Sequence, residues 1–487
     1  MQPRSMLPTT CAVWPTVCAR NLSLLPDEHA TRSIEEAGDD RGLRCVVRRL
    51  RAAQPVRIAV LGGSISTGSS YQIKRGDAGA YLYHAQLRAA LQHMFPPRGG
   101  RPHIVHNGAL PATGPSFFEH CLDAQLPGPA TPPDMVILEF SINTDGTSSR
   151  VSFERMLRKL LRRSPPPAVL VVNVHYFKRE CPGPPWSWDN KRCSRRLQSW
   201  SRADEDAVAS LCRYYNVPLV SMRAAFFAPG SNTTLDGIYQ NPGVYMADKA
   251  HPNAQGHTYL AQFILKRMLL RTRVPPSEQR LDSACPLNQS GSLTHRSECL
   301  IASDHQCTED AAKELCVSGH GLQDVVVQGS NTGFILTDEG FSMKLGLLAT
   351  IADSSISFAL FNSASTKRTR LVLWLGYLQS YQGMGRARFM CRLACKCKGV
   401  VDAHSERRVS ITEVATLPVV VEGVGMCQLE LRIDGSSSSG GHKFKVMSMI
   451  LSAARHRLPG LWGPVANVFT HMAAGSSQDV TREPSTS

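Results

Sequence analysis

The stretch Arg57–Ser70, RIAVLGGSISTGSS, decides how the first half of the chain folds. Its first five residues form a short apolar run of the kind that builds a buried strand, and two glycines and a serine follow directly. Because glycine accepts backbone angles that other residues avoid, this run predicts a strand that turns sharply, with Ser64 at the rim of its sheet. An ordinary N-cap serine would show the same local pattern, so a catalytic role for Ser64 requires partners elsewhere.

Strand-like and helix-like segments alternate from residue 57 to about residue 271. This alternation is typical of a buried parallel sheet with helices on both of its faces. In such a sheet the ligand crevice lies outside the carboxyl ends of the strands, and Ser64 follows the first strand at that end. The expected strands are RIAVL, HIVHN, MVILEF, AVLVVNV and VPLV.

Polar segments follow other expected strands at the same edge of the sheet. HNGALPATG contains Gly108, LEFSINTDG contains Asn143, and MADKAHPNAQGH contains Asp248 and His251. Acyl transfer needs a hydroxyl nucleophile, an imidazole that moves its proton, a carboxylate that orients the imidazole, and donors for the oxyanion. Ser64, His251 and Asp248 fit the first three roles, while the backbone N–H groups of Ser64 and Gly108 and the amide of Asn143 fit the last. The alternatives are a capping serine or aspartate, a packed histidine and a turn asparagine.

These segments resemble the motif blocks of the SGNH (GDSL-type) hydrolase family, which occur here in the family's order as GGSIS, NGA, SINTD and DKAHP. The resemblance implies a flavodoxin-like three-layer α/β/α domain in which Ser64 attacks an ester. It implies esterase, lipase or carbohydrate O-acyl chemistry. No departure from the family pattern removes a reacting group. The departures are Gly63 in place of Asp, Ile65 in place of Leu, Ser141 in place of Gly, and Thr144 between Asn143 and Asp145.

The character of the chain changes beyond residue 271. A cysteine-rich stretch comes first, and short strand-like runs separated by Gly, Ser and Asp then indicate an antiparallel β-sandwich. These runs are DVVVQG, SISFALF, TRLVLWLGYL, ARFMCRLAC, RVSITEV, LPVVVEG, CQLELRI and KFKVMSMI. The predicted layout is an N-terminal segment (1–52), an α/β hydrolase domain (53–273), a cysteine-rich linker (274–321), a β-sandwich domain (322–454) and a mobile tail (455–487).

Cysteines and glycosylation sequons favour a secretory or extracellular route. The chain has 15 cysteines and sequons at Asn21, Asn232 and Asn288, although its N-terminal residues form a poor signal peptide. The odd cysteine count leaves at least one thiol free or paired with another chain. Cys181 and Cys193 are candidates to close a polar loop that shapes the pocket.

Two groups of residues raise the question of a metal. His106 and His175 fall at strand ends and could line the pocket or bind a metal, but no carboxylate matches them. The segment CRLACKC suits either zinc or disulfides, and we expect disulfides in an exported sheet domain. Its candidate ligands are Cys391, Cys395, Cys397 and either Cys427 or His404. We therefore predict no metal and no cofactor.

The charge of the chain bears on its partners. The 54 Lys and Arg residues exceed the 39 Asp and Glu residues, and the net charge of +15 favours anionic partners such as acidic polysaccharide. No aromatic-rich basic motif indicates nucleic acid binding, and no apolar run approaches the ~18 residues of a membrane-spanning helix. The oligomeric state is not predicted.

Together these observations predict a serine esterase that works through an acyl-enzyme and deacylates O-acylated carbohydrate or lipid, with an anionic glycan favoured. The β-domain would bind carbohydrate or position the enzyme. A carbohydrate O-acyltransferase is an alternative with the same first step. A non-catalytic glycan-binding protein is an alternative of a different class.

Overall fold

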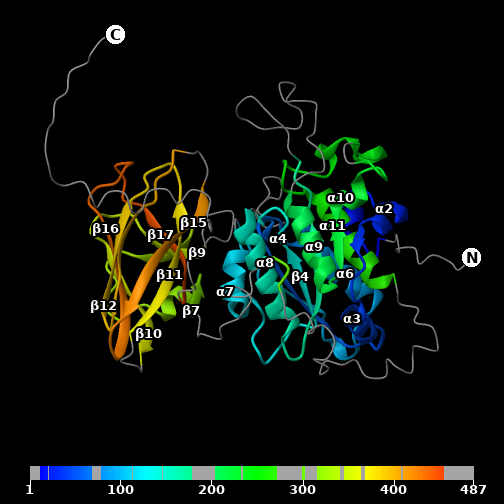
Figure 1. Cartoon of the computed structure of the whole chain (residues 1–487). Coiled ribbons are helices and arrows are strands. Elements are labelled where there is room, and N and C mark those ends of the chain that lie inside the picture. The colour runs from blue at the N-terminus through cyan, green and yellow to red at the C-terminus, as the bar shows by residue number, and fades with distance from the viewer. Residues whose placement is uncertain are drawn as a thin grey trace, which may run out of the picture. The chain divides into compact units, whose positions relative to one another are not determined.

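The computed structural model describes residues 11–19, 21–68, 78–111, 113–144, 146–177, 203–231, 234–270, 299–301, 315–339, 345–363, 368–406 and 410–453. The chain divides into two compact units (Figure 1). Unit 1 comprises Met1–Leu322, Leu336–Gly346 and Met447–Ser452, and unit 2 comprises Gln323–Ile335, Leu347–Val446 and Ala453–Ser487. Some expectations lie outside the described residues, namely the Cys181–Cys193 loop, the sequons at Asn232 and Asn288, and the tail 455–487.

Unit 1 is built on a sheet of six strands. They are β1 (Ile34–Glu36), β2 (Arg57–Gly62), β3 (Ile104–Asn107), β4 (Met135–Glu139), β5 (Ala168–Asn173) and β6 (Leu219–Ser221). Their order is β1-β6-β5-β4-β2-β3, with β2 to β6 parallel and β1 antiparallel to β6 at the edge. The order of the parallel strands is that of flavodoxin-like sheets, which confirms the expected fold. The antiparallel edge strand was not expected from the sequence.

Helices cover both faces of this sheet, and the strand residues alternate between them. Ile58 and Val60 of β2 pack in one apolar core, whereas Ala59 and Leu61 pack in the other. The first core includes α3 (Arg41–Arg51), α6 (Tyr83–Met94), α10 (Met222–Phe226) and α11 (Ala254–Leu269). The second includes α7 (Pro115–Gln125), α8 (Gly146–Leu161) and α9 (Ala203–Tyr215). The strands are therefore buried on both faces, as their continuous apolar runs predicted.

Shorter helices complete the described part of the chain. They are α1 (Pro15–Ala19), α2 (Asp27–Arg32), α4 (Ser64–Thr67), α5 (Ala78–Tyr81), α14 (Gly321–Asp324) and the 3₁₀ turns η1 (Arg98–Gly100), η2 (Gly237–Gln240) and η3 (Pro242–Val244). Among the described residues, no helix combines the length and apolar character needed to cross a bilayer.

Residues 11–51 belong to unit 1, although the sequence indicated only an N-terminal segment there. They supply α1, α2, β1 and α3, and Trp14 is buried in the same apolar core as α11. Asp27 at the start of α2 accepts a hydrogen bond from Lys266 Nζ of α11 at 2.7 Å. A disulfide closes Cys11 with Cys18. This segment thus covers part of the core that holds α11.

One disulfide of unit 1 joins distant parts of the sequence. Cys316 lies in β7 (Leu315–Ser318) and is bonded to Cys121 of α7, 195 residues earlier. The sequence placed Cys316 in a cysteine-rich linker and gave no indication of this partner. The residues that β7 pairs with, Ser448–Leu451, also belong to unit 1.

Antiparallel strands form two sheets in the C-terminal part of the chain. The strands are β8 (Ile335–Asp338), β9 (Leu345–Ala349), β10 (Ser355–Ser363), β11 (Thr369–Gln379), β12 (Arg386–Leu393), β13 (Cys395–Lys396), β14 (Lys398–Asp402), β15 (Ile411–Val421), β16 (Gly425–Ile433) and β17 (Phe444–Ala453). One sheet has the order β10-β16-β12-β14, and the other contains β13-β15-β11-β17-β9-β8. The ring of Phe389 from the first sheet lies 6.1 Å from that of Phe444 in the second, so the sheets pack face to face as the expected sandwich.

Some of the expected strands differ in detail. DVVVQG is not a strand, because α14 takes its first residue and a turn follows at Gly329, which leaves only a single bridge from Val326 to Phe358. RVSITEV and LPVVVEG contribute to one continuous strand, β15. The sequence therefore indicated two strands where the structure has one.

The cysteines of CRLACKC form disulfides, as expected. Cys391 is bonded to Cys397, and Cys395 is bonded to Cys427. The sulfur atoms of Cys391, Cys395 and Cys427 lie within 4.8 Å of one another, but disulfide sulfur does not offer the thiolate that zinc requires.

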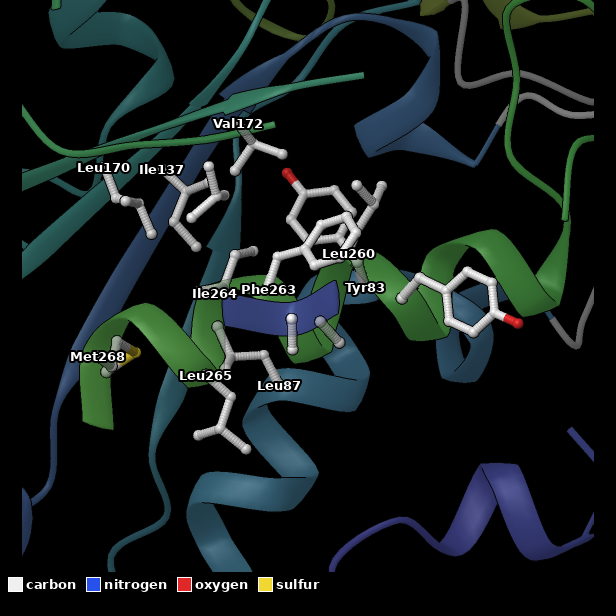
Figure 2. Packing of buried hydrophobic residues seen from close by; sticks show 14 of the residues in the cluster. Tyr83, Leu87, Ile137, Leu170, Val172, Leu260, Phe263, Ile264, Leu265 and Met268 are labelled. Carbon is white, nitrogen blue, oxygen red and sulfur yellow. The ribbon is translucent and has the colours of Figure 1, made fainter. Parts of the chain in front are cut away.

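Figure 2 shows the apolar contacts that hold α11 against the sheet. Phe263 and Leu260 of α11 are fully buried beside Ile137 of β4 and Val172 of β5. Since α11 directly follows the segment that contains Asp248 and His251, this core fixes where that segment ends.

We predict that Phe263→Ala lowers the free energy of unfolding by about 3–5 kcal/mol, because it removes a buried ring and leaves a cavity. The matched control is Leu270→Ala, since Leu270 follows α11 and is 39% exposed. Urea unfolding of the full chain, followed by the helical circular dichroism signal, measures both. Equal midpoints for the two variants would contradict the packing described.

Candidate active site

Ser64 begins α4, directly after Gly62, which ends β2, and Gly63, which caps α4. A Cβ on Gly62 would lie 2.7 Å from the carbonyl oxygen of Glu139 and from Ser66 Oγ, so only glycine fits at this corner. The Thr67 hydroxyl donates to the Ser64 carbonyl oxygen at 3.1 Å and closes the turn. The corner thus presents the half-buried Ser64 at the carboxyl end of β2.

His251 lies opposite Ser64, in the segment that leads into α11. Its Nε2 is 2.7 Å from Ser64 Oγ. The segment is held by Asn253, whose side chain accepts the N–H groups of Gln255 and Gly256 and so caps α11. The backbone N–H of Ala247 donates to the His251 carbonyl oxygen at 2.8 Å. These bonds hold the backbone of the segment and leave both ring nitrogens of His251 for Ser64 and Asp248.

Asp248 orients the imidazole from the other side. His251 Nδ1 lies 2.8 Å from Asp248 Oδ2 and 3.0 Å from Oδ1. Asp248 Oδ1 also accepts the backbone N–H groups of Ala250 and His251 at 2.7 and 2.8 Å. An ionised carboxylate only accepts hydrogen bonds, so Nδ1 carries the proton and Nε2 is left to accept the Ser64 hydroxyl.

The charge state of Asp248 suits this role. Burial raises the pKa of Asp248, but the hydrogen bond and charge of His251, with the N–H groups of Ala250 and His251, outweigh it and hold the pKa below its usual value. The carboxylate is therefore ionised at neutral pH. The side chains of His251 and Asp248 are each 21% exposed, so the pair lies at the surface of unit 1 where a substrate can reach it.

Asn143 lies against the glycine that precedes the nucleophile. It follows β4 in a turn closed by the bond from its N–H to the Phe140 carbonyl oxygen at 2.8 Å. A Cβ on Gly63 would lie 2.1 Å from Asn143 Oδ1 and 3.3 Å from Nδ2. The departure from the family pattern at Gly63 thus has a physical reason, because the amide of Asn143 occupies the space of a side chain.

Gly108 is placed differently from expectation. Its N–H donates to the carbonyl oxygen of Val60 at 2.9 Å within the sheet, and a Cβ on Gly108 would lie 2.1 Å from the carbonyl oxygen of Gln125. Close packing against Gln125 therefore explains why residue 108 is a glycine. Its N–H is already bonded to the carbonyl oxygen of Val60. Gly114, the second glycine of HNGALPATG, is nearer the site, since its Cβ would lie 2.7 Å from the Asn143 carbonyl oxygen. Gly114 was not among the residues expected from the sequence, where its signal was the following Pro115 at the start of α7.

The two other histidines at strand ends have separate partners. His106 Nε2 lies 3.0 Å from the Gln125 carbonyl oxygen, and His175 Nδ1 lies 2.8 Å from Glu205 Oε2. His175 and Glu205 are both buried. The structure therefore does not bring His106 and His175 together as a ligand pair.

Comparison with known proteins agrees with the fold. Residues 60–259 match the family described as GDSL-like Lipase/Acylhydrolase. Unit 1 contains a GDSL-like lipase/acylhydrolase domain. This GDSL-type domain makes the chain a hydrolase that acts on ester bonds. Comparison with curated protein sequences gave no match.

Solved structures resemble both parts of the chain. One is a two-domain esterase (CEX) active on acetylated mannans, with a TM-score of 0.53 and 20% identity over 88% of this chain and 99% of that chain. Another is a two-domain esterase of the same description co-crystallized with mannopentaose, with a TM-score of 0.52 and 20% identity over 87% of this chain and 99% of that chain. At this identity the likeness shows a shared two-domain fold.

We predict that Gly63→Ala lowers kcat by about 10²- to 10³-fold, because the added methyl group displaces the Asn143 amide from the nucleophile turn. Gly79→Ala is the matched control, since nothing lies within 4 Å of a Cβ at that helical position. Kinetics on an activated acetyl ester, with thermal unfolding of both variants, measure the effect. Equal kcat values for the two variants would show that catalysis does not depend on the position of the Asn143 amide.

Proposed function

We propose that this hydrolase cleaves esters through an acyl-enzyme formed on Ser64. The observation that carries the proposal is the continuous chain of hydrogen bonds from Ser64 Oγ through both nitrogens of His251 to Asp248. A hydroxyl, an imidazole and a carboxylate in this order are what a serine hydrolase requires.

In the first half of the reaction, Ser64 Oγ attacks the carbonyl carbon of the ester while His251 Nε2 takes the hydroxyl proton. The carbonyl oxygen becomes an oxyanion, and His251 then gives its proton to the leaving alcohol as the carbon–oxygen bond breaks. In the second half, His251 takes a proton from water while the water oxygen attacks the acyl carbon. His251 then returns this proton to Ser64 Oγ as the bond between Ser64 and the acyl carbon breaks and the acid leaves. Asp248 stabilises the imidazolium in both halves.

The oxyanion needs donors, and we assign them to the backbone N–H of Ser64, the side-chain amide of Asn143 and the backbone N–H of Gly114. Gly114 replaces Gly108 in this assignment because the Gly108 N–H is bonded to the Val60 carbonyl oxygen. Each such donor typically contributes about 10²- to 10³-fold in rate.

For the substrate we propose an O-acylated carbohydrate. The similar two-domain esterase is active on acetylated mannans, which supports a glycan ester. The net charge of +15 favours an anionic glycan within this class. The β-sandwich would bind the carbohydrate or position the enzyme on it. A lipid ester remains the alternative within the same chemistry.

We also propose that the protein works outside the reducing cytosol. Disulfides occur in both units, for example between Cys11 and Cys18 and between Cys395 and Cys427. Such bonds persist in secretory and extracellular compartments.

We predict that Ser64→Ala lowers the rate of acid release by roughly 10⁴- to 10⁶-fold, because it removes the nucleophile. Acetate release from acetylated mannan, and from a small activated acetyl ester, measures this rate. Ser210→Ala is the control, since Ser210 is an exposed serine on α9 that only bonds to the Asp206 carbonyl oxygen. Full activity in Ser64→Ala would exclude the proposed mechanism, and an inactive wild type would favour a binding protein.

Product analysis separates hydrolysis from acyl transfer. We predict that the wild type releases free acid at the same rate with and without an added unacylated glycan, because water is the acceptor. Acylated glycan formed at the expense of free acid would instead identify an O-acyltransferase.

A further inference from the structure

A buried carboxyl group lies beside the nucleophile turn and takes no part in the steps above. Glu139 is the last residue of β4, and it is 0% exposed. Its Oε2 accepts the hydroxyl of Ser66 at 2.9 Å. The main-chain carbonyl oxygen of Glu139 accepts the N–H of Gly63 at 3.3 Å. Gly63 and Ser66 lie on either side of Ser64 in the sequence.

Ser66 is held at its hydroxyl and at its carbonyl oxygen. Besides its bond to Glu139, Ser66 Oγ lies 2.9 Å from the hydroxyl of Tyr83. Its carbonyl oxygen accepts hydrogen bonds from His84 Nε2 at 3.1 Å and from Asn107 Nδ2 at 2.9 Å. Since α4 has only 4 residues, it is too short to be stable alone, and these outside bonds set where it lies.

Glu139 connects the nucleophile turn to the loop that contains Asn143. Gly62 and Glu139 are partners in the register of β2 and β4, and the Gly63 N–H lies 3.3 Å from the Glu139 carbonyl oxygen. The loop with Asn143 begins directly after Glu139. Glu139 therefore bonds to Gly63 on one side of Ser64 and to the Ser66 hydroxyl on the other, and the asparagine loop starts directly after it.

We propose that Glu139 is a positioning residue, whose carboxyl group holds the α4 turn through Ser66 so that Ser64 faces His251 with the Asn143 amide alongside. This inference rests on the proposed role of Ser64 as the nucleophile. The carboxyl group acts through Ser66 and does not touch the substrate.

The surroundings of Glu139 favour the uncharged form. Burial raises the pKa of Glu139 to about 8, although the hydrogen bonds from Ser66 and Gly63 lower it. Its Oε1 is buried without a hydrogen-bond partner among the described residues, so an ionised carboxylate would lack solvation on one oxygen.

The titratable groups that face this carboxyl group come from two helices. Tyr83 and His84 lie on α6, and His257 of α11 stacks on the Tyr83 ring with the centroids 6.1 Å apart. Burial raises the pKa of Tyr83, and it lowers the pKa of His84 to about 4 and that of His257 to about 3. These three groups are therefore uncharged between pH 6 and 9, the range in which Glu139 ionises.

The first test compares Glu139→Ala with Glu154→Ala. Glu154 is the matched control, because it is equally buried, accepts the Tyr215 hydroxyl at 2.7 Å and has no part in the site. We expect Glu139→Ala to lower kcat by about 10²-fold with KM unchanged, because a misplaced nucleophile slows chemistry and not binding. Glu139→Gln keeps an acceptor oxygen and should restore most of kcat. Glu154→Ala should affect stability without affecting kcat.

The second test is the pH profile of kcat. An acid with a raised pKa is uncharged below that pKa, so a negative charge appears beside the nucleophile turn as the pH rises through about 8. We expect the kcat of the wild type to fall there and that of Glu139→Gln to stay level. If Glu139 had only a structural role, the kcat of the wild type and that of Glu139→Gln would depend on pH in the same way.

Ser64→Ala assayed in parallel separates failure of this inference from failure of the proposed function. An active Ser64→Ala would overturn the nucleophile assignment itself. An inactive Ser64→Ala, with Glu139→Ala as active as Glu154→Ala, would overturn only the role of Glu139. If Glu139→Ala does not fold, the profile of Glu139→Gln decides, and a fall at the same pH as in the wild type overturns the inference.

Discussion

The hydrogen bond between Ser64 Oγ and His251 Nε2 is the interaction on which the site depends. It spans 2.7 Å and joins residues 187 positions apart in the chain. Neither residue is placed by its own neighbours alone. The glycine corner after β2 presents Ser64, whereas the Asn253 cap and the buried face of α11 place His251. The apolar core therefore does more than stabilise unit 1, because it fixes the separation of two reacting groups.

The sequence predicted the three-layer unit because burial on both faces leaves a simple pattern. Strands such as β2 and β4 are continuous apolar runs, and the helices between them repeat at helical spacing. The carboxyl ends of parallel strands share one edge, so polar residues after different strands meet there. Ser64, Asp248 and His251 were found in this way, and the structure brings them within hydrogen-bonding distance.

Other features could not be predicted, because they depend on what a neighbouring strand or helix already uses. The sequence does not reveal whether the N–H of a glycine after a strand is bonded within the sheet. The N–H of Gly108 is bonded to Val60, which is why Gly114 replaces it in the proposed site. The pairing of Cys121 with Cys316 spans 195 residues and follows only from the folded arrangement. Glu139 looked like the end of an apolar strand, and its contacts with the nucleophile turn become visible only in the structure.

The reactivity of Ser64 toward a fluorophosphonate probe tests the central claim most directly. The probe phosphonylates a serine whose proton a neighbouring base removes, and peptide mass spectrometry locates the modified residue. The account predicts rapid labelling of the wild type at Ser64 alone, and strongly slowed labelling of His251→Ala with its fold intact. Labelling of a different serine, or equal labelling rates in the wild type and His251→Ala, would contradict it.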